Sequence, residues 1–111
     1  MRRTEAMAVL RANRAGLRAE FGIKSLALFG SVARDQGRPD SDVDLLVEFD
    51  RPIGLLHLVG TAQHLEKLLG VAKVDLVLRR AVLPELQEPI FAEAVNVFDA
   101  PSLEIAHPAH A

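Results

Sequence analysis

Residues 29–44 contain the pattern that most restricts how this chain can fold. A Gly30-Ser31 pair follows one apolar run, and Asp42 and Asp44 stand two residues apart at the head of another. Alternate residues of a strand project to the same face of a sheet, so a strand here would place the two carboxylates side by side. Two such charges repel each other unless a cation lies between them. Together with the backbone N–H donors of the turn, they suit a metal-bound polyphosphate.

The composition indicates one globular domain. The chain has 111 residues, half of them hydrophobic, which is enough for a single two-layer core. Its formal net charge of -2 is not that of a protein that coats nucleic acid, so nucleic acid is not expected as a direct ligand. The absence of cysteine excludes disulfides and thiolate metal sites. Without a membrane-length apolar run or a secretory signal, we expect no membrane association and a cytoplasmic location.

Helical spacing of apolar residues and turn chemistry predict helices over residues 4–21, 31–36, 55–69 and 84–94. Gly22 and Gly70 are placed to end the two long helices. Pro84 suits the first turn of the last helix, whereas Pro89 lies inside it and is a candidate break.

Short apolar runs bounded by turn residues predict strands over residues 25–29, 42–49, 73–78 and 95–98. We find no internal repeat and no linker. Residues 1–98 are therefore expected to form one domain, and residues 99–111, rich in Pro, Ala and His, to form a fraying tail.

A third acid strengthens the case for a metal site. Asp75 interrupts an apolar strand, where a lone acid is unfavourable unless it is paired or bound to a cation. Three acids on neighbouring strands form an oxygen-rich site of the kind that Mg²⁺ prefers, and metals held there can activate an attacking oxygen and stabilise a leaving pyrophosphate. The simpler alternative puts Asp42 and Asp44 at a solvated strand entry and Asp75 at an exposed strand end. The residues alone leave both readings open.

The Gly30-Ser31 turn is a candidate phosphate site. Glycine lets the backbone approach a ligand closely, and a serine at a helix start can cap the helix or bind an anion. Gly-Ser is also an ordinary strand-to-helix turn. Arg34, one helical turn later, could reach a phosphate or pair with Asp35 or Asp40 on the surface.

Two further sets of side chains have an ordinary structural reading. Arg11, Arg14 and Arg18 share one predicted helical face, which is usually solvated, with contact to nucleic acid or an acidic partner as the alternative. His57 and His64 share a helix side without a third ligand, so packing or surface roles are favoured over metal binding.

Taken together, the motifs resemble the minimal nucleotidyltransferases, a family of the DNA polymerase beta-like superfamily. The family pattern is Gly-Ser-x-Ala-Arg-Gly, a spacer, then Ser-Asp-x-Asp-Leu. The chain carries Gly30-Ser31-Val32-Ala33-Arg34 and Ser41-Asp42-Val43-Asp44-Leu45 at matching spacing, followed by Asp75. The resemblance covers roughly residues 22–98. Asp35 stands where the family often has glycine, which predicts an altered loop and an additional negative charge near the phosphates.

The resemblance implies an α/β (α+β) fold with a small mixed β-sheet flanked by helices, as in polymerase beta-like nucleotidyltransferases. It implies Mg²⁺ as cofactor and ATP as substrate. The implied nucleotide-binding residues are Gly30, Ser31, Arg34 and Ser41. The implied catalytic and metal-binding carboxylates are Asp42, Asp44 and Asp75, of which the last would activate the acceptor hydroxyl.

The resemblance also implies a protein acceptor. Small members of the family often pair with a HEPN-domain protein as a toxin–antitoxin couple, and some are similar to adenylyltransferases that modify a tyrosine of the toxin. We therefore expect a magnesium-dependent transfer of AMP from ATP to a hydroxyl of a HEPN partner. Two alternatives stay open: a binding module that masks its partner sterically, and a transferase for a small molecule, for which a homo-oligomer would have to complete the pocket.

Overall fold

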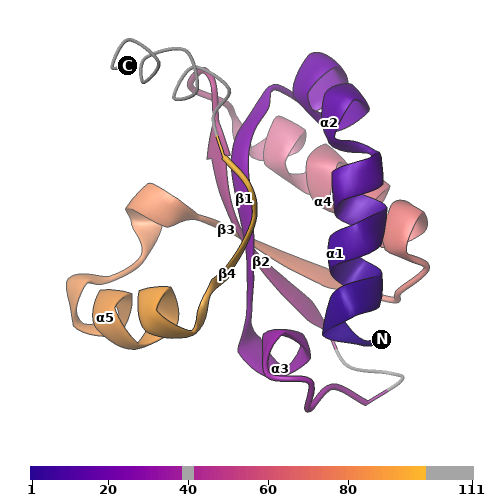
Figure 1. Ribbon diagram of the computed structural model, residues 1–111. Helices are drawn as coiled ribbons and strands as arrows, with labels where there is room; N and C mark the ends of the chain where they lie inside the picture. Colours follow the sequence, from indigo (N-terminus) through magenta and orange to yellow (C-terminus); the bar gives the residue numbers. More distant parts are fainter. Residues whose placement is uncertain (39–41, 100–111) are drawn as a thin grey trace, which may run out of the picture.

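The computed structural model describes residues 1–38 and 42–99, and in them helices lie on both faces of one sheet (Figure 1). In chain order the elements are α1 (Arg3–Ala12), α2 (Arg14–Phe21), β1 (Ile23–Phe29), α3 (Gly30–Ala33), β2 (Val43–Phe49), α4 (Leu55–Leu69), β3 (Val74–Leu78), the 3-10 turn η1 (Arg79–Ala81), α5 (Pro84–Glu93) and β4 (Val95–Phe98). The expected fold class is confirmed. Ser41 and the predicted tail beyond Asp99 lie outside the described residues.

The sheet is mixed, with the strand order β3-β2-β1-β4. β1 pairs antiparallel with both β2 and β4, whereas β2 and β3 are parallel and are joined through α4. In this register Asp44 of β2 lies opposite Phe29 of β1 on one side and opposite Asp75 of β3 on the other. The topology therefore brings together acids that are 31 positions apart in the sequence.

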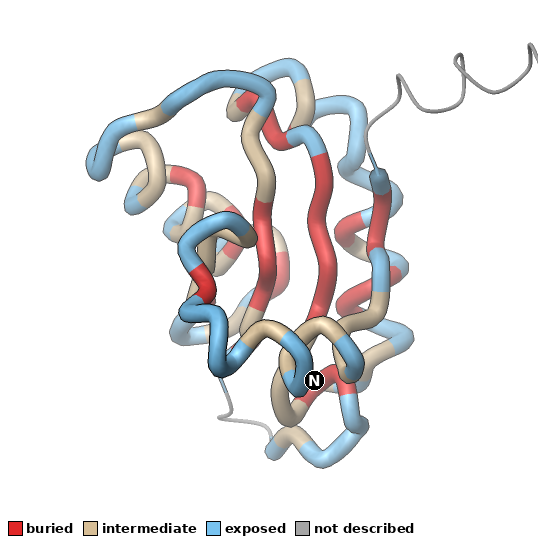
Figure 2. Tube along the Cα trace, turned by 90° about the vertical axis from the view of Figure 1, so that its left-hand side faces the viewer, coloured by how far each residue is buried: buried red, intermediate tan, exposed pale blue. Residues whose placement is uncertain are grey.

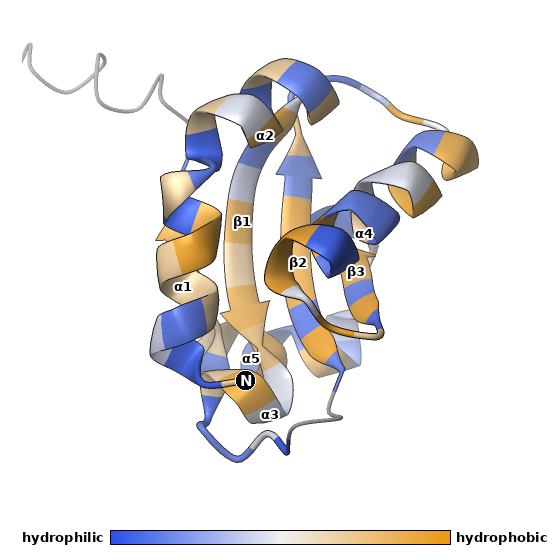
Figure 3. Ribbon diagram, turned by 90° about the vertical axis from the view of Figure 1, so that its right-hand side faces the viewer, coloured by the Kyte–Doolittle hydropathy of each residue, from blue (hydrophilic) through white to orange (hydrophobic). Residues whose placement is uncertain are grey.

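The two faces of the sheet are covered unequally. One face packs against α1, α2 and α4 in a core in which Leu10, Leu28 and Leu65 are fully buried. The other face carries a smaller apolar cluster around Ala27 and Leu46, against which α5 packs. Figure 2 shows the buried positions concentrated in the central strands, and Figure 3 shows apolar stretches along β1 and β2. Because side chains alternate along β2, Asp44 lies on the same face as Leu46, the α5 side.

The first predicted helix is wrong as a single element. The chain breaks at Asn13 into α1 and α2, and Asn13 has non-helical dihedral angles. Its side-chain Nδ2 donates to the carbonyl of Val9 at 2.8 Å. A short amide side chain that bonds the preceding turn competes with the helical backbone pattern, which explains the break.

The helix predicted over residues 84–94 is confirmed, and the candidate break at Pro89 does not occur, because α5 continues through Pro89 to Glu93. Proline removes one backbone hydrogen bond of a helix. Here Ile90 and Phe91 pack on the sheet just beyond it and hold the last turn in place. The continuation matters because it delivers Glu93 to the start of α3.

Of the arginines predicted on a solvated face, Arg11 is exposed and Arg18 is partly buried, and both also bind β4 or the residue that follows it. Arg11 donates from Nε to the carbonyl of Val97 at 2.9 Å and from Nη2 to that of Asn96 at 3.1 Å. Arg18 donates to the carbonyl of Asp99 and lies over the ring of Phe98, 4.9 Å from its centroid. These contacts give both side chains a structural role.

The packing role expected for the two histidines is confirmed. His57 Nε2 lies 2.7 Å from the carbonyl oxygen of Phe21, and the ring of His64 packs 4.6 Å from that of Phe21. Across residues 1–38 and 42–99, no helix is long and apolar enough to span a membrane.

Candidate active site

Gly30 directly follows β1 as the first residue of α3, and its backbone is pressed against Asp44. Its φ of +78° is a conformation that side-chain-bearing residues rarely adopt. A Cβ at this position would lie 2.9 Å from Asp44 Cγ and closer still to Oδ2. Glycine is therefore required twice, once for the dihedral angle and once for the space taken by the carboxylate. Ser31 follows in the first turn of α3.

The three predicted acids influence one another through Asp44. Its pKa is raised from 3.8 to about 6, first by burial, then by the charge of Asp75 and a hydrogen bond with it, and more weakly by the charges of Asp42 and Glu93. A carboxyl group so surrounded by like charge lacks a compensating cation. The sheet thus brings the three predicted carboxylates close together, and among the described residues their negative charge at Asp44 is not balanced by a cation.

Lys73 supplies part of the missing positive charge. Its Nζ lies 3.5 Å from Asp75 Oδ1 and 4.0 Å from Asp42 Oδ2. All three side chains are about half exposed, so these ion pairs contribute little to stability. The ammonium group lies beside the outer acids and forms no ion pair with the more buried Asp44 among the described residues.

The donor chemistry fits a hard divalent cation such as Mg²⁺, since three carboxylates offer oxygen ligands only. Their mutual repulsion, visible in the raised pKa of Asp44, is what a bound cation would relieve. In the part of the chain that the structure describes, no three carboxylates or imidazoles are close enough together to hold a metal ion. Asp42, Asp44 and Asp75 would have to reorient to bind one.

Arg34 does not pair with Asp35, one of the two surface partners considered for it; the other, Asp40, lies outside the described residues. Its Nη1 donates to Glu93 Oε1 at 2.7 Å, and its Nε donates to Gln36 at 3.1 Å. The second oxygen of Glu93 accepts the backbone N–H of Gly30 at 2.9 Å. Two of the four residues assigned to nucleotide binding by the family motif, Gly30 and Arg34, therefore donate to one carboxylate.

Sequence reasoning missed Glu93. It is the last residue of α5, a position where the helix dipole favours cations over acids. An acid at the C-terminal end of a helix is a weak indication that a group outside the helix stabilises it. Nothing in the linear pattern indicated that its partner would be the Gly30 turn, because the two residues lie 63 positions apart in the chain.

The side-chain contacts of Asp35 in this structure are with α1, and its predicted effect on the phosphates stays a prediction. Its carboxylate turns to the start of α1, where Oδ1 accepts the backbone N–H of Arg3 at 2.9 Å and Oδ2 lies 3.9 Å from the Arg3 guanidinium. Asp35 has a φ of 57°, in the left-handed region, which explains why glycine is frequent at this position. Aspartate tolerates that region better than most residues, and its hydrogen bond offsets part of the strain.

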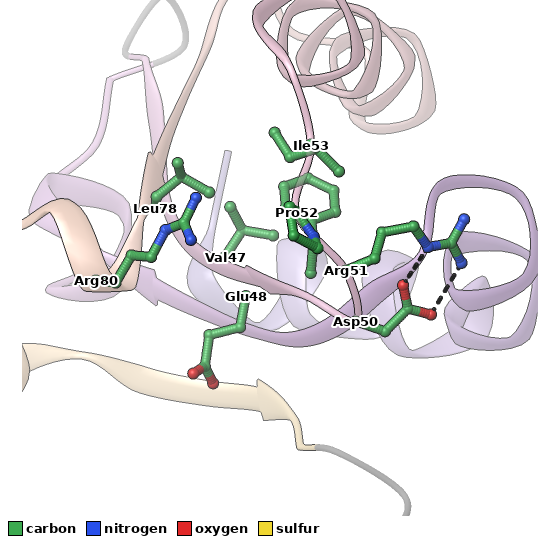
Figure 4. Close-up of a pocket in the computed structure, with 9 residues that line it drawn as sticks. Val47, Glu48, Asp50, Arg51, Pro52, Ile53, Leu78 and Arg80 are labelled. Atoms are coloured by element: carbon green, nitrogen blue, oxygen red, sulfur yellow. Dashed lines mark hydrogen bonds and ion pairs between the residues drawn. The ribbon is translucent and has the colours of Figure 1, made fainter.

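Glu48, a further acid on β2, lies at the other end of this strand from Asp44. Four residues of strand separate it from Asp44 by about 13 Å. It accepts a hydrogen bond from Ser25 Oγ at 2.6 Å. Figure 4 shows it beside a pocket of about 280 Å³ that Arg51, Ile53 and Arg80 also line. None of Asp42, Asp44 and Asp75 lines this pocket, so neither it nor Glu48 belongs to the candidate site.

The fold and the carboxylates facing a glycine turn are those of an enzyme that transfers nucleotidyl groups. Residues 10–97 match the family model described as the nucleotidyltransferase domain. The chain belongs to this family, and the resemblance to the minimal nucleotidyltransferases is confirmed.

Relatives and solved structures agree with this assignment. The chain is 36% identical over 93 residues to a protein adenylyltransferase, MntA, of Thermococcus cleftensis, covering 84% of this chain and 93% of the relative. A solved structure assigned as a minimal nucleotidyltransferase superposes with a TM-score of 0.70 at 40% identity, covering 86% of this chain and 95% of the other. The MNT antitoxin in complex with a tri-AMPylated HEPN toxin of Shewanella oneidensis shares the fold, with a TM-score of 0.62 at 18% identity, over 90% of this chain and 78% of the other.

Proposed function

We propose that this nucleotidyltransferase moves AMP from ATP to a hydroxyl group of a partner protein, with Mg²⁺ as cofactor. The observation that carries the proposal is the register of β2 and β3, which sets Asp44 opposite Asp75 beside the Gly30 turn. A relative named as a protein adenylyltransferase supports AMP as the transferred group. The AMPylated HEPN toxin bound to a related antitoxin supports a protein as the acceptor.

In this proposal the Gly30 turn binds the triphosphate. The backbone N–H of Gly30 and the guanidinium of Arg34 donate hydrogen bonds to phosphate oxygens, and Ser31 and Ser41 contribute their hydroxyls. Asp42 and Asp44 are the ligands for Mg²⁺, with Asp75 as the third carboxylate. When bound, Mg²⁺ neutralises the acids and the phosphates and stabilises the charge that develops on the leaving pyrophosphate.

Asp75 has a second role as the group that receives the proton of the acceptor hydroxyl. As the acceptor oxygen forms its bond to the α-phosphorus, the bond from that phosphorus to the bridging oxygen of the β-phosphate breaks. The proton passes to the Asp75 carboxylate, and pyrophosphate leaves. Asp75 suits this role because it is half exposed at the start of β3 and open to an incoming acceptor.

The partner we propose is a HEPN toxin that the chain neutralises as an antitoxin. Exposed apolar side chains are consistent with a protein partner: Leu55 and Leu56, at the start of α4, are 74% and 87% exposed. Large apolar residues grouped on a surface are typical of protein interfaces.

The test measures transfer of radiolabel from α-labelled ATP to a co-purified HEPN partner. Asp75→Asn should reduce transfer by about 10²- to 10⁴-fold, as expected when a general base is lost, while ATP binding stays measurable. Glu48→Gln is the matched control. It makes the same acid-to-amide change on the same face of the sheet, but far from the Gly30 turn. It should leave transfer unchanged.

Three other results would redirect the assignment. If the wild type labels no partner but the complex still silences the toxin, the chain acts as a steric binding module. If label appears only on a small molecule, the protein acceptor is wrong. If Asp75→Asn transfers AMP as fast as the wild type, another group receives the acceptor proton.

A further inference from the structure

The carboxylate of Glu93 occupies the place where the proposed function needs a phosphate. Its Oε2 accepts the N–H of Gly30 at 2.9 Å and its Oε1 accepts from Arg34 Nη1 at 2.7 Å. Each oxygen thus takes one of the two donors, as two oxygens of a phosphate group would. The carboxylate is partly shielded, with its side chain 29% exposed.

The position of Glu93 is otherwise unfavourable. It ends α5, where the helix dipole disfavours an acid. It also adds negative charge next to Asp44, whose pKa it helps to raise. Among the described residues its hydrogen bonds are those from Gly30 and Arg34. A carboxylate held against such repulsion is ready to leave when a stronger anion binds the same donors.

We propose that Glu93 is an internal competitor of the nucleotide, one that holds the Gly30 N–H and Arg34 in the empty enzyme and is displaced by a phosphate of ATP. The inference rests on the proposed function, because it assumes that these donors bind the triphosphate. It makes Glu93 the residue that sets nucleotide affinity.

The affinity for phosphate-bearing ligands is the first measurement. Glu93→Gln keeps the size of the side chain and an oxygen that can accept from Gly30, but it loses the charge that attracts Arg34. Calorimetric titration with ATP and Mg²⁺ should show about tenfold tighter binding than the wild type, since charge-assisted hydrogen bonds are stronger than neutral ones. Tripolyphosphate with Mg²⁺ should show the same gain, and adenosine should show none.

Two further variants keep the test specific. Glu88→Gln removes the same charge from an exposed position of α5 and should bind ATP as the wild type does. Glu93→Asp keeps the charge but is one methylene shorter, so it cannot reach both donors at once. It should bind ATP more tightly than the wild type and less tightly than Glu93→Gln. If the glutamine variant folds poorly, the comparison of Glu93→Asp with the wild type still tests the inference.

The Gly30 amide signal in an NMR spectrum reports the displacement itself. Without ligand, wild type and Glu93→Gln should differ at this amide, because the acceptor differs. Saturated with ATP and Mg²⁺, the two spectra should coincide there, because the phosphate has replaced both side chains. Signals that still differ at saturation would mean that residue 93 stays in place, which overturns the inference.

The affinities separate the inference from the function on which it rests. If the wild type binds ATP but Glu93→Gln binds it equally or less tightly, Glu93 positions the turn instead of competing, and the inference alone fails. If neither the wild type nor any Glu93 variant binds ATP with Mg²⁺, the inference and the proposed nucleotide chemistry fail together.

Discussion

Removing the charge of Asp44 should stabilise the metal-free protein, and the effect should depend on pH. In the folded chain the pKa of Asp44 is raised from 3.8 to about 6, chiefly by burial and by Asp75. Below pH 4 the group is protonated in both the folded and the unfolded chain and has no such effect. Between pH 4 and 6 the folded chain binds the extra proton, so the free energy of unfolding falls as pH rises. Above pH 6 this decrease in the free energy of unfolding is complete.

The magnitude follows from the size of that pKa difference. For a fully buried group, a pKa difference of this size would lower the free energy of unfolding by about 3 kcal/mol. Asp44 is only half-buried, so solvent screening reduces this to about 1–2 kcal/mol. Asp44→Asn removes the penalty at pH 8, and for a domain of this size the gain corresponds to a melting temperature higher by about 5–10 °C. At pH 4 the variant and the wild type should melt together.

The assay is thermal unfolding followed by circular dichroism at pH 4 and pH 8 in the presence of a chelator. Asp50→Asn is the control, because the hydrogen bond from Arg51 lowers the pKa of Asp50 and its removal should bring no gain at pH 8. Mg²⁺ at pH 8 should raise the melting temperature of the wild type more than that of Asp44→Asn. A lower melting temperature for Asp44→Asn at pH 8, or an equal gain at both pH values, would refute the electrostatic reasoning.

Two further substitutions test the turn. Gly30→Ala should lower the free energy of unfolding by about 1–2 kcal/mol in urea titrations, through the strained φ and the clash with Asp44, and should weaken ATP binding; unchanged ATP affinity would contradict the placement of the turn. Asp35→Ala should cost about 1–2 kcal/mol, since strain remains and the Arg3 contact is lost, whereas Asp35→Gly should be nearly neutral because relief of strain offsets that loss. Equal effects of the two would argue against the left-handed strain.

Local patterns sufficed wherever a contact lies within one element or its turn. The helix over residues 55–69 and the last strand over residues 95–98 appear with the predicted bounds. Gly22 and Gly70 end their helices in the left-handed conformation, as expected of glycine after a helix. These features depend on dihedral preference and apolar spacing, both of which can be read from neighbouring residues.

Local patterns failed where a distant contact overrides a preference. The helix continues past Pro89 because Ile90 and Phe91 pack on the sheet. Asn13 is a local exception, since its side chain breaks the periodic helix by binding the carbonyl of Val9, four residues earlier. The structural role of Arg11 and Arg18 was not predicted, because the carbonyls that they bind, in β4 and just after it, lie more than 80 positions away in the chain.

The sequence by itself determined the chemistry available to this protein: a glycine turn, an arginine after it and three acids at the heads of apolar strands. Motifs of this kind are short, and their meaning lies in residue type and spacing. Only the tertiary structure decided which groups meet. Parallel pairing sets Asp75 opposite Asp44, and α5 brings Glu93 to Gly30 and Arg34. The reason is physical: charge and hydrogen bonding act through space over a few ångströms, whatever the number of residues between the partners.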